Sequence, residues 1–118
     1  MLQALPVLNC MHFMAPVSLA DWRSYEVPGV VGILRKHSSG QYELVDAFDC
    51  QSVPVVRDLI LNEKFSRWVE AAGGLENVRF DVFLMPQADV SRRTDVVTLI
   101  ERSCGFRLPA APAYVNAA

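Results

Sequence analysis

Three polar side chains of this sequence have the chemistry needed to hold and cleave a phosphodiester: Tyr42, Arg57 and Glu101. Such cleavage needs positive charge near the phosphoryl oxygens, an activated water molecule and usually a metal ion held by oxygen ligands. Arg57 offers a planar guanidinium that can hold a phosphate, and Tyr42 can orient water. Glu101 falls about 100° from the centre of an apolar helical stripe, so its carboxylate can face a cleft. These three residues are therefore candidate catalytic residues.

Each candidate also has an explanation that needs no chemistry. Arg57 has apolar helical neighbours, so an ion pair with Asp46 or Asp58 explains it as well as phosphate binding does. Tyr42 suits a strand residue that packs on the core, and Glu101 suits a solvated helix position. Asp46 itself more often pairs with an arginine or a backbone amide than it acts as an acid or base.

Nucleic-acid contacts are predicted at Lys36 and His37, which lie in a polar turn, and at Arg57. The net charge of −2 and the pI near 5.6 argue against a strongly electrostatic nucleic-acid binder, whose surface is usually basic. We therefore expect nucleic-acid binding to be weak and sensitive to salt.

A hairpin from Val27 to Phe48 is the main element that must position these residues. Its first half contains a nearly unbroken apolar run, which predicts a strand covered on both faces and placed inside the sheet: Val30, Val31, Ile33 and Leu34. Gly40 supplies a positive φ for the turn. In the second half, strict alternation places four side chains on one face: Tyr42, Leu44, Asp46 and Phe48.

Helices are predicted on both sides of this hairpin. A short helix opens at Ser18 and runs to about Tyr25. After the hairpin, Ser52 caps a helix over Val53–Leu61, and Asn62 caps another over Glu63–Ala72. Gly73 and Gly74 end the latter helix.

A third strand over Val78–Met85 and a last helix complete the predicted domain. That helix starts at Asp89 or Ser91 and ends at Gly105, with an apolar stripe of Val96, Val97, Leu99, Ile100 and Cys104. The order after the short N-terminal helix is strand, strand, helix, helix, strand, helix. It predicts a small single α+β domain, a three-stranded sheet with helices packed on it.

The length of 118 residues suits one domain, which we expect over residues 18–108. Residues 1–17 form an apolar N-terminal arm, and residues 109–118 form a Pro/Ala-rich tail. Three isolated cysteines without CxxC spacing favour a reduced, intracellular and cytoplasmic setting. Neither a secretory signal nor a membrane span is expected, because the apolar N-terminal stretch carries no basic residue and is broken by prolines.

The element order, with Pro28-Gly29-Val30-Val31-Gly32-Ile33 at its start, resembles the GIY-YIG nuclease family over about residues 27–105. The first family motif falls on Gly29–Val31 and the second on Tyr42–Leu44. The resemblance implies that Arg57 is the family's helical arginine. It also implies that Glu101 binds the one divalent metal ion, Mg²⁺ or Mn²⁺.

The sequence departs from this family at two motif positions. Val31 replaces a tyrosine that helps to activate the attacking water, and Leu44 replaces a glycine. The resemblance therefore implies a divergent or inactivated metal-dependent endonuclease that acts on or binds DNA. The alternative is a non-enzymatic interaction or assembly protein, a subunit of a larger complex or a homo-oligomer, which uses its apolar arm and its tail.

Overall fold

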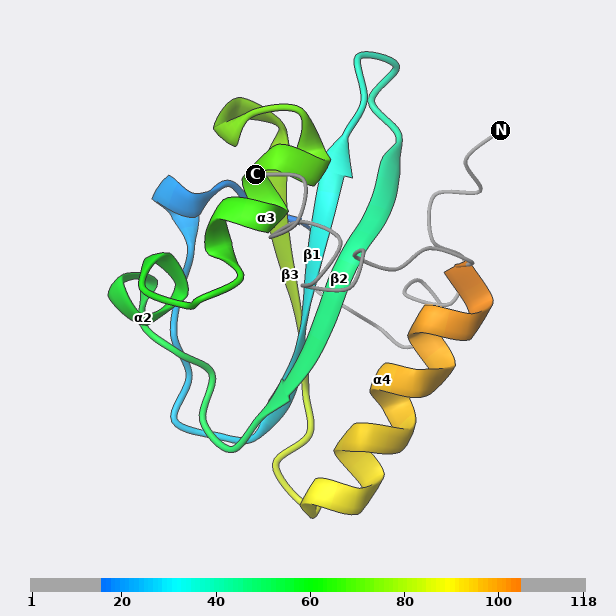
Figure 1. The fold of residues 1–118 in the computed structure, drawn as a ribbon. Helices are drawn as coiled ribbons and strands as arrows, with labels where there is room; N and C mark the ends of the chain where they lie inside the picture. Colours follow the sequence, from blue (N-terminus) through cyan, green and yellow to red (C-terminus); the bar gives the residue numbers. More distant parts are fainter. Residues whose placement is uncertain (1–15, 105–118) are drawn as a thin grey trace.

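Three antiparallel strands form one sheet of order β2-β1-β3 in the computed structural model, which describes residues 16–104 (Figure 1). The strands are β1 (Gly29–Lys36), β2 (Tyr42–Cys50) and β3 (Val78–Leu84). The central strand is β1, and it is buried from Gly29 to Leu34. The predicted interior position of this strand is confirmed, because an apolar run without alternation must be covered on both faces.

Helices cover both faces of this sheet. One face carries α2 (Val56–Ile60) and α3 (Phe65–Ala72), and the opposite face carries α4 (Val90–Cys104) (Figure 1). Two short 3₁₀ turns, η1 (Leu19–Asp21) and η2 (Leu75–Asn77), complete the order. The predicted α+β class and element order are confirmed. The predicted arm and tail fall outside the described residues, apart from Pro16 and Val17, and Val17 pairs with Phe80 at the edge of β3.

Each face of the sheet has its own apolar cluster. The cluster under α3 includes Val31, Ile33, Val45, Trp68, Phe80 and Val82. The cluster under α4 includes Val30, Leu34, Leu44, Ala47 and Ile100. Burial of an aliphatic side chain stabilises the folded state by about 1.5–3 kcal/mol, so both clusters are needed to hold helices on a sheet this small.

A β-bulge in β2 overturns the predicted alternation of that strand. Ile33 pairs with Asp46 and Leu34 pairs with Leu44, so Val45 is an extra residue on β2. Tyr42 and Leu44 therefore pack on the α4 side, whereas Phe48 packs on the α3 side. The prediction that these side chains share one face is wrong, because one inserted residue exchanges the two faces beyond it.

The bulge also directs Asp46 towards α3, where it meets Trp68. The indole Nε1 of Trp68 donates to Asp46 Oδ2 at 2.9 Å, and both side chains are buried. The indole ring stacks on Phe48, with ring centres 5.9 Å apart, and meets Phe65 and Phe80 edge-on. A single fully buried side chain thus joins α3 to strands β2 and β3.

Two helix starts differ from the prediction. The helix expected from Val53 begins at Val56, because Val53 exchanges backbone hydrogen bonds with Tyr25 and Val55 is extended. The expected cap at Ser52 is therefore wrong. The expected cap at Asn62 is wrong as well, because Lys64 precedes Phe65, the first residue of the next helix; Asn62 Oδ1 accepts the N–H of Lys64 at 2.8 Å in the turn before it.

Other predicted ends of elements are confirmed. Gly40, Gly73 and Gly74 have positive φ, and the N–H of Gly74 closes α3 by donating to Val69 O. Asp89 Oδ1 accepts the N–H of Arg92 at the start of α4. The helix expected from Ser18 to Tyr25 shortens to η1, because Trp22 is already extended and Tyr25 pairs with Val53.

We expect Trp68→Phe to lower the free energy of unfolding more than Trp22→Phe does. Each change removes one indole hydrogen bond, but Trp68 donates to a buried carboxylate and Trp22 to the carbonyl of Pro54. The loss should be about 2–3 kcal/mol at Trp68 and about 1 kcal/mol at Trp22, as measured by urea unfolding. Adding Asp46→Asn to Trp68→Phe should restore part of the loss, because a neutral amide tolerates burial better. A double variant less stable than Trp68→Phe alone would contradict this account.

Candidate functional site

Two of the three predicted catalytic residues lie on the α4 side of the sheet. Tyr42 is half-buried on β2 and packs against the cluster that contains Leu34, Leu44 and Ile100. Glu101 follows Ile100 on α4 and is half-buried. Tyr42 and Glu101 therefore belong to the same layer of the domain.

Arg57 lies on the opposite side of the sheet. It is exposed on α2, whose Leu59 packs into the α3-side cluster. The structure thus brings Tyr42 and Glu101 to one face and leaves Arg57 on the other. Among the described residues, Arg57 forms no ion pair with Asp46, which interacts instead with Trp68 and lies 3.9 Å from Lys64 Nζ.

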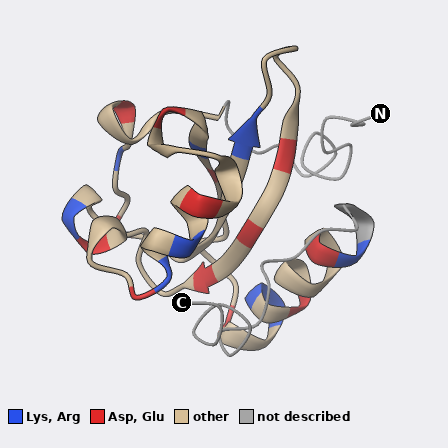
Figure 2. Cartoon of the chain, turned by 45° about the horizontal axis from the view of Figure 1, so that its top comes forward, with Lys and Arg blue, Asp and Glu red and all other residues tan. Residues whose placement is uncertain are grey.

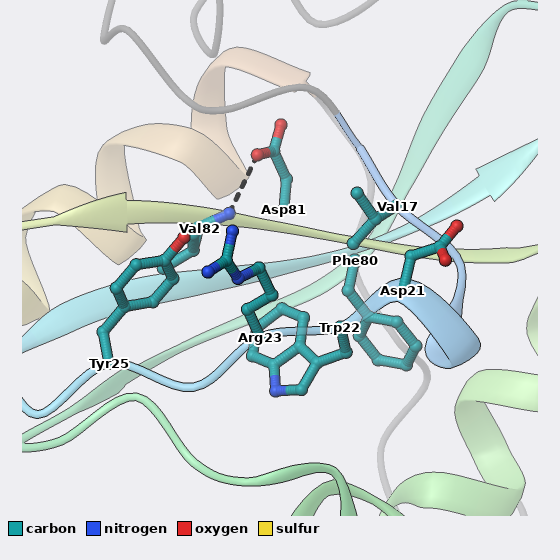
Figure 3. Close-up of a pocket in the computed structure, with 8 residues that line it drawn as sticks. All are labelled: Val17, Asp21, Trp22, Arg23, Tyr25, Phe80, Asp81 and Val82. Atoms are coloured by element: carbon teal, nitrogen blue, oxygen red, sulfur yellow. Dashed lines mark hydrogen bonds between the residues drawn. The ribbon is translucent and has the colours of Figure 1, made fainter.

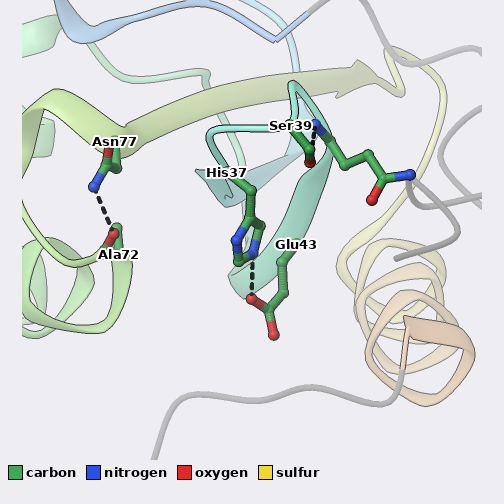
Figure 4. A network of polar contacts seen from close by, with 6 residues as sticks. His37, Ser39, Glu43, Ala72 and Asn77 are labelled. Carbon is green, nitrogen blue, oxygen red and sulfur yellow. Dashed lines mark hydrogen bonds and ion pairs between the residues drawn. The ribbon is translucent and has the colours of Figure 1, made fainter. Parts of the chain in front are cut away.

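The two remaining nucleic-acid candidates sit together at the hairpin end. Lys36 is exposed, and His37 is half-buried with its Nε2 2.8 Å from Glu43 Oε1 (Figure 4). Both line a polar pocket with Arg35, Ser38 and Asn77. Arg57 does not line this pocket, so the predicted nucleic-acid residues do not form a single site.

A metal site is not evident within residues 16–104, where no group of three or more His, Cys, Asp or Glu side chains is placed to hold an ion. The Mg²⁺ or Mn²⁺ site on Glu101 stays a prediction from the family resemblance.

Two aspartates on the outer strands have a structural role. Asp46 Oδ1 accepts the N–H of Ala47, and Asp81 Oδ1 accepts the N–H of Val82, each at 2.8 Å. These bonds occupy backbone donors on β2 and β3, which are the outer strands of the sheet. The expected pairing of Asp46 with a backbone amide is confirmed, and no acid–base chemistry is needed to explain either carboxylate.

Asp81 was not singled out from the sequence, yet it is the most perturbed carboxylate in the described chain. Its side chain is buried, and this burial raises its pKa to about 7, while the hydrogen bond from Val82 acts in the opposite direction. A buried carboxylate without a cationic partner favours its neutral form. On β3, Asp81 shares a face with Arg79 and Phe83. This mixed neighbourhood in the sequence did not indicate that Asp81 is buried.

Cys50 is not an activated nucleophile. Its thiol Sγ lies 3.4 Å from Gly29 O, and burial raises its pKa to about 11. The thiolate that nucleophilic catalysis needs is therefore disfavoured at neutral pH.

Arg93 is a second buried charge that the sequence did not reveal. Its Nη1 donates to Ala88 O at 2.9 Å, and its Nε lies 3.4 Å from Asp49 Oδ2. Arg93 thus takes a place in the buried stripe of α4 with Val96, Val97 and Ile100. Leu99, predicted in that stripe, is 46% exposed, because it lies off the row spaced by three and four residues.

An exposed apolar surface surrounds α2. Four aliphatic side chains in a seven-residue stretch are at least 40% exposed: Val55, Val56, Ile60 and Leu61. We call this set the α2 patch. Within α2 only Leu59 is buried, and the helix stands at the margin of the fold (Figure 1). Such a concentration of exposed aliphatic side chains is typical of interaction surfaces.

A small apolar pocket lies beside β3, between this strand and the segment that follows η1 (Figure 3). Its aromatic walls are Trp22, Tyr25 and Phe80, and the rings of Trp22 and Phe80 have centres 5.7 Å apart. The volume is about 150 Å³, whereas small-molecule sites usually have roughly 300–1,000 Å³. We therefore assign no small-molecule substrate to it.

Comparisons of the chain with protein-family models, curated proteins and solved structures gave no significant match. Among the described helices, none combines the length and apolar character needed to cross a membrane.

We expect the purified chain to show no metal-dependent DNA cleavage that depends on both Arg57 and Glu101. Arg57 lies across the sheet from Tyr42 and Glu101, and Val31 has no group that can activate water. The test is a plasmid-nicking assay with Mg²⁺ or Mn²⁺, comparing the natural chain with Glu101→Gln and Arg57→Gln. Robust cleavage abolished by both substitutions would contradict this prediction.

We expect Asp81→Asn to stabilise the fold at pH 8 and much less at pH 4.5. The pKa of Asp81 is raised to about 7 when folded and is about 4 in an unfolded chain. The folded state therefore binds the proton more tightly, and stability falls as the pH rises from about 4 to 7. Asparagine keeps an oxygen for the Val82 N–H and has no charge.

The expected gain is about 1–3 kcal/mol in the free energy of unfolding at pH 8, measured by urea unfolding at both pH values. Asp95→Asn, which removes an exposed carboxylate from α4, is the matched control and should have little effect. An equal gain at both pH values would contradict a raised pKa at Asp81.

Proposed function

We propose that this domain is a non-catalytic assembly module that binds a second copy of itself through the α2 patch. The observation that carries the proposal is the exposure of four aliphatic side chains in one short stretch, with Leu61 at 68%. Removal of such side chains from water contributes about 25 cal/mol per Å² of apolar surface, which favours association. The separation of Arg57 from Tyr42 and Glu101 makes the endonuclease the less supported candidate.

The charges within the patch support a second copy as the partner. Arg57 and Asp58 are adjacent and exposed on α2. A two-fold arrangement of two α2 helices sets Arg57 of one copy opposite Asp58 of the other, so the surface is complementary to itself. The net charge of −2 adds only weak repulsion between copies.

The size of the patch sets the expected strength. A stable interface buries about 800 Å² on each partner, which is more than a five-residue helix can supply alone. The association is therefore expected to be weak, with a dissociation constant in the micromolar range or above.

We expect the full chain to dimerise with rising concentration in sedimentation velocity experiments, and Leu61→Glu to abolish the dimer. A glutamate in the patch must lose its hydration when the surfaces meet. Leu99→Glu is the matched control, because Leu99 is also an exposed leucine, on α4 and away from the patch.

A charge exchange tests the two-fold arrangement itself. Arg57→Asp alone should weaken the dimer through two like-charge contacts, and the double variant Arg57→Asp with Asp58→Arg should restore it. A chain that stays monomeric at millimolar concentration would overturn the proposal. Equal loss with Leu61→Glu and Leu99→Glu would show that α2 is not the surface used.

A further inference from the structure

A polar pocket of about 450 Å³ lies at the end of β1, where the hairpin meets the segment between α3 and β3. Three consecutive basic residues line it together with Ser38 and Asn77: Arg35, Lys36 and His37. Figure 2 shows this end of β1 in the colour of Lys and Arg. Among the described residues none of those that line the pocket is acidic, although the carboxylate of Glu43 lies beside it as the partner of His37.

Arg35 is the least compensated group in this pocket. Its Nε is buried and has no hydrogen-bond partner among the described residues, and no carboxylate within them pairs with the guanidinium. A buried or half-buried charge without a partner lowers stability unless something else neutralises it. Because Nε is closed off from solvent, an anion in the pocket can reach this guanidinium only through its Nη groups, for which the described chain provides no hydrogen-bond or ion-pair partner.

The surroundings of Arg35 bring a second donor close to it. Arg35 Nη2 and Asn77 Nδ2 each lie 3.5 Å from the point where a Cβ on Gly73 would stand. Because Gly73 lacks a side chain, both groups approach the same short backbone segment. Asn77 Nδ2 donates to Ala72 O at 3.2 Å, which fixes the amide and leaves its other N–H available (Figure 4).

The two other basic side chains complete the donor set. Lys36 is exposed and has no ion pair in the described chain. His37 is held at the rim by Glu43, at 2.8 Å. Neither Arg35 nor Lys36 forms an ion pair in the described chain, and Glu43, the cross-strand neighbour of Arg35, contacts His37 instead.

We propose that this pocket binds a phosphate group, with Arg35 as the fork that holds two oxygens and Lys36 as the second charge. A phosphate monoester carries a charge of about −1.5 to −2, which matches two free cations, whereas a carboxylate carries only one charge. The proposal does not depend on the α2 patch, which lies on another element.

Amide shifts in NMR spectra of the full chain test this site. We titrate inorganic phosphate, and separately acetate, at constant ionic strength. Phosphate should shift the amides of residues 35–40 and of Asn77 with saturation, and acetate should bind about tenfold more weakly because it offers one charge.

Two substitutions locate the binding. Lys36→Gln removes one charge, and Arg35→Lys keeps the charge but removes the fork; each should weaken phosphate binding about tenfold. Arg102→Gln, which removes an exposed charge from α4, is the matched control and should leave it unchanged. If a thermal melt shows that Arg35→Lys does not fold, the result for Lys36→Gln, which changes an exposed residue, decides the test. Shifts that do not saturate, or that Lys36→Gln and Arg102→Gln reduce equally, would overturn the proposal.

Two further ligands identify the source of the phosphate. Tighter binding of thymidine monophosphate than of inorganic phosphate would assign a nucleotide, and equal binding would assign the phosphate group alone. For a short oligothymidylate bound through this pocket, the logarithm of the association constant should fall with the logarithm of the salt concentration with a slope of about −1.4, because two cations neutralise two phosphates of a single strand. In Lys36→Gln this slope should weaken to about −0.7, because one cation remains.

Discussion

The contact between Trp68 and Asp46 is the constraint on which the rest of the fold depends. The indole is fully buried, donates to a buried carboxylate and touches three aromatic rings. It can do so only because the bulge at Val45 turns Asp46 towards α3. The same bulge turns Leu44 towards α4, so one inserted residue supplies both faces of an outer strand with the side chains that each helix layer needs.

This two-faced arrangement explains why the predicted catalytic set is not assembled. The single sheet lies between α2 and α4, so side chains on these two helices are on opposite faces of it and do not share a site. Arg57 belongs to the first layer, and Tyr42 and Glu101 belong to the second. The sequence places the three residues on suitable elements, but the face that an element covers depends on contacts far apart in the chain.

The parts of the fold that were predictable from sequence are those set by local physics. The unbroken apolar run of β1, the paired glycines after α3 and the Asp89 cap each follow from neighbouring residues. The bulge, the late start of α2 and the burial of Arg93 depend instead on distant partners: Ile33, Tyr25 and Asp49. The basic hairpin end was visible in the sequence as Lys36 and His37. The missing hydrogen-bond partner of Arg35 Nε was not visible, because it is a property of the packed structure.

The edges of the sheet bear on where a partner can attach. An outer strand with free N–H groups invites another strand to pair with it. Here Asp46 and Asp81 occupy one such donor on each outer strand, and Val17 exchanges both its hydrogen bonds with Phe80 on β3. A strand added at either edge must first displace these bonds. The α2 patch has no such barrier, because the described chain covers none of its four exposed side chains fully. The proposed association through the side chains of α2 therefore displaces no backbone hydrogen bond of the sheet, whereas growth of the sheet would.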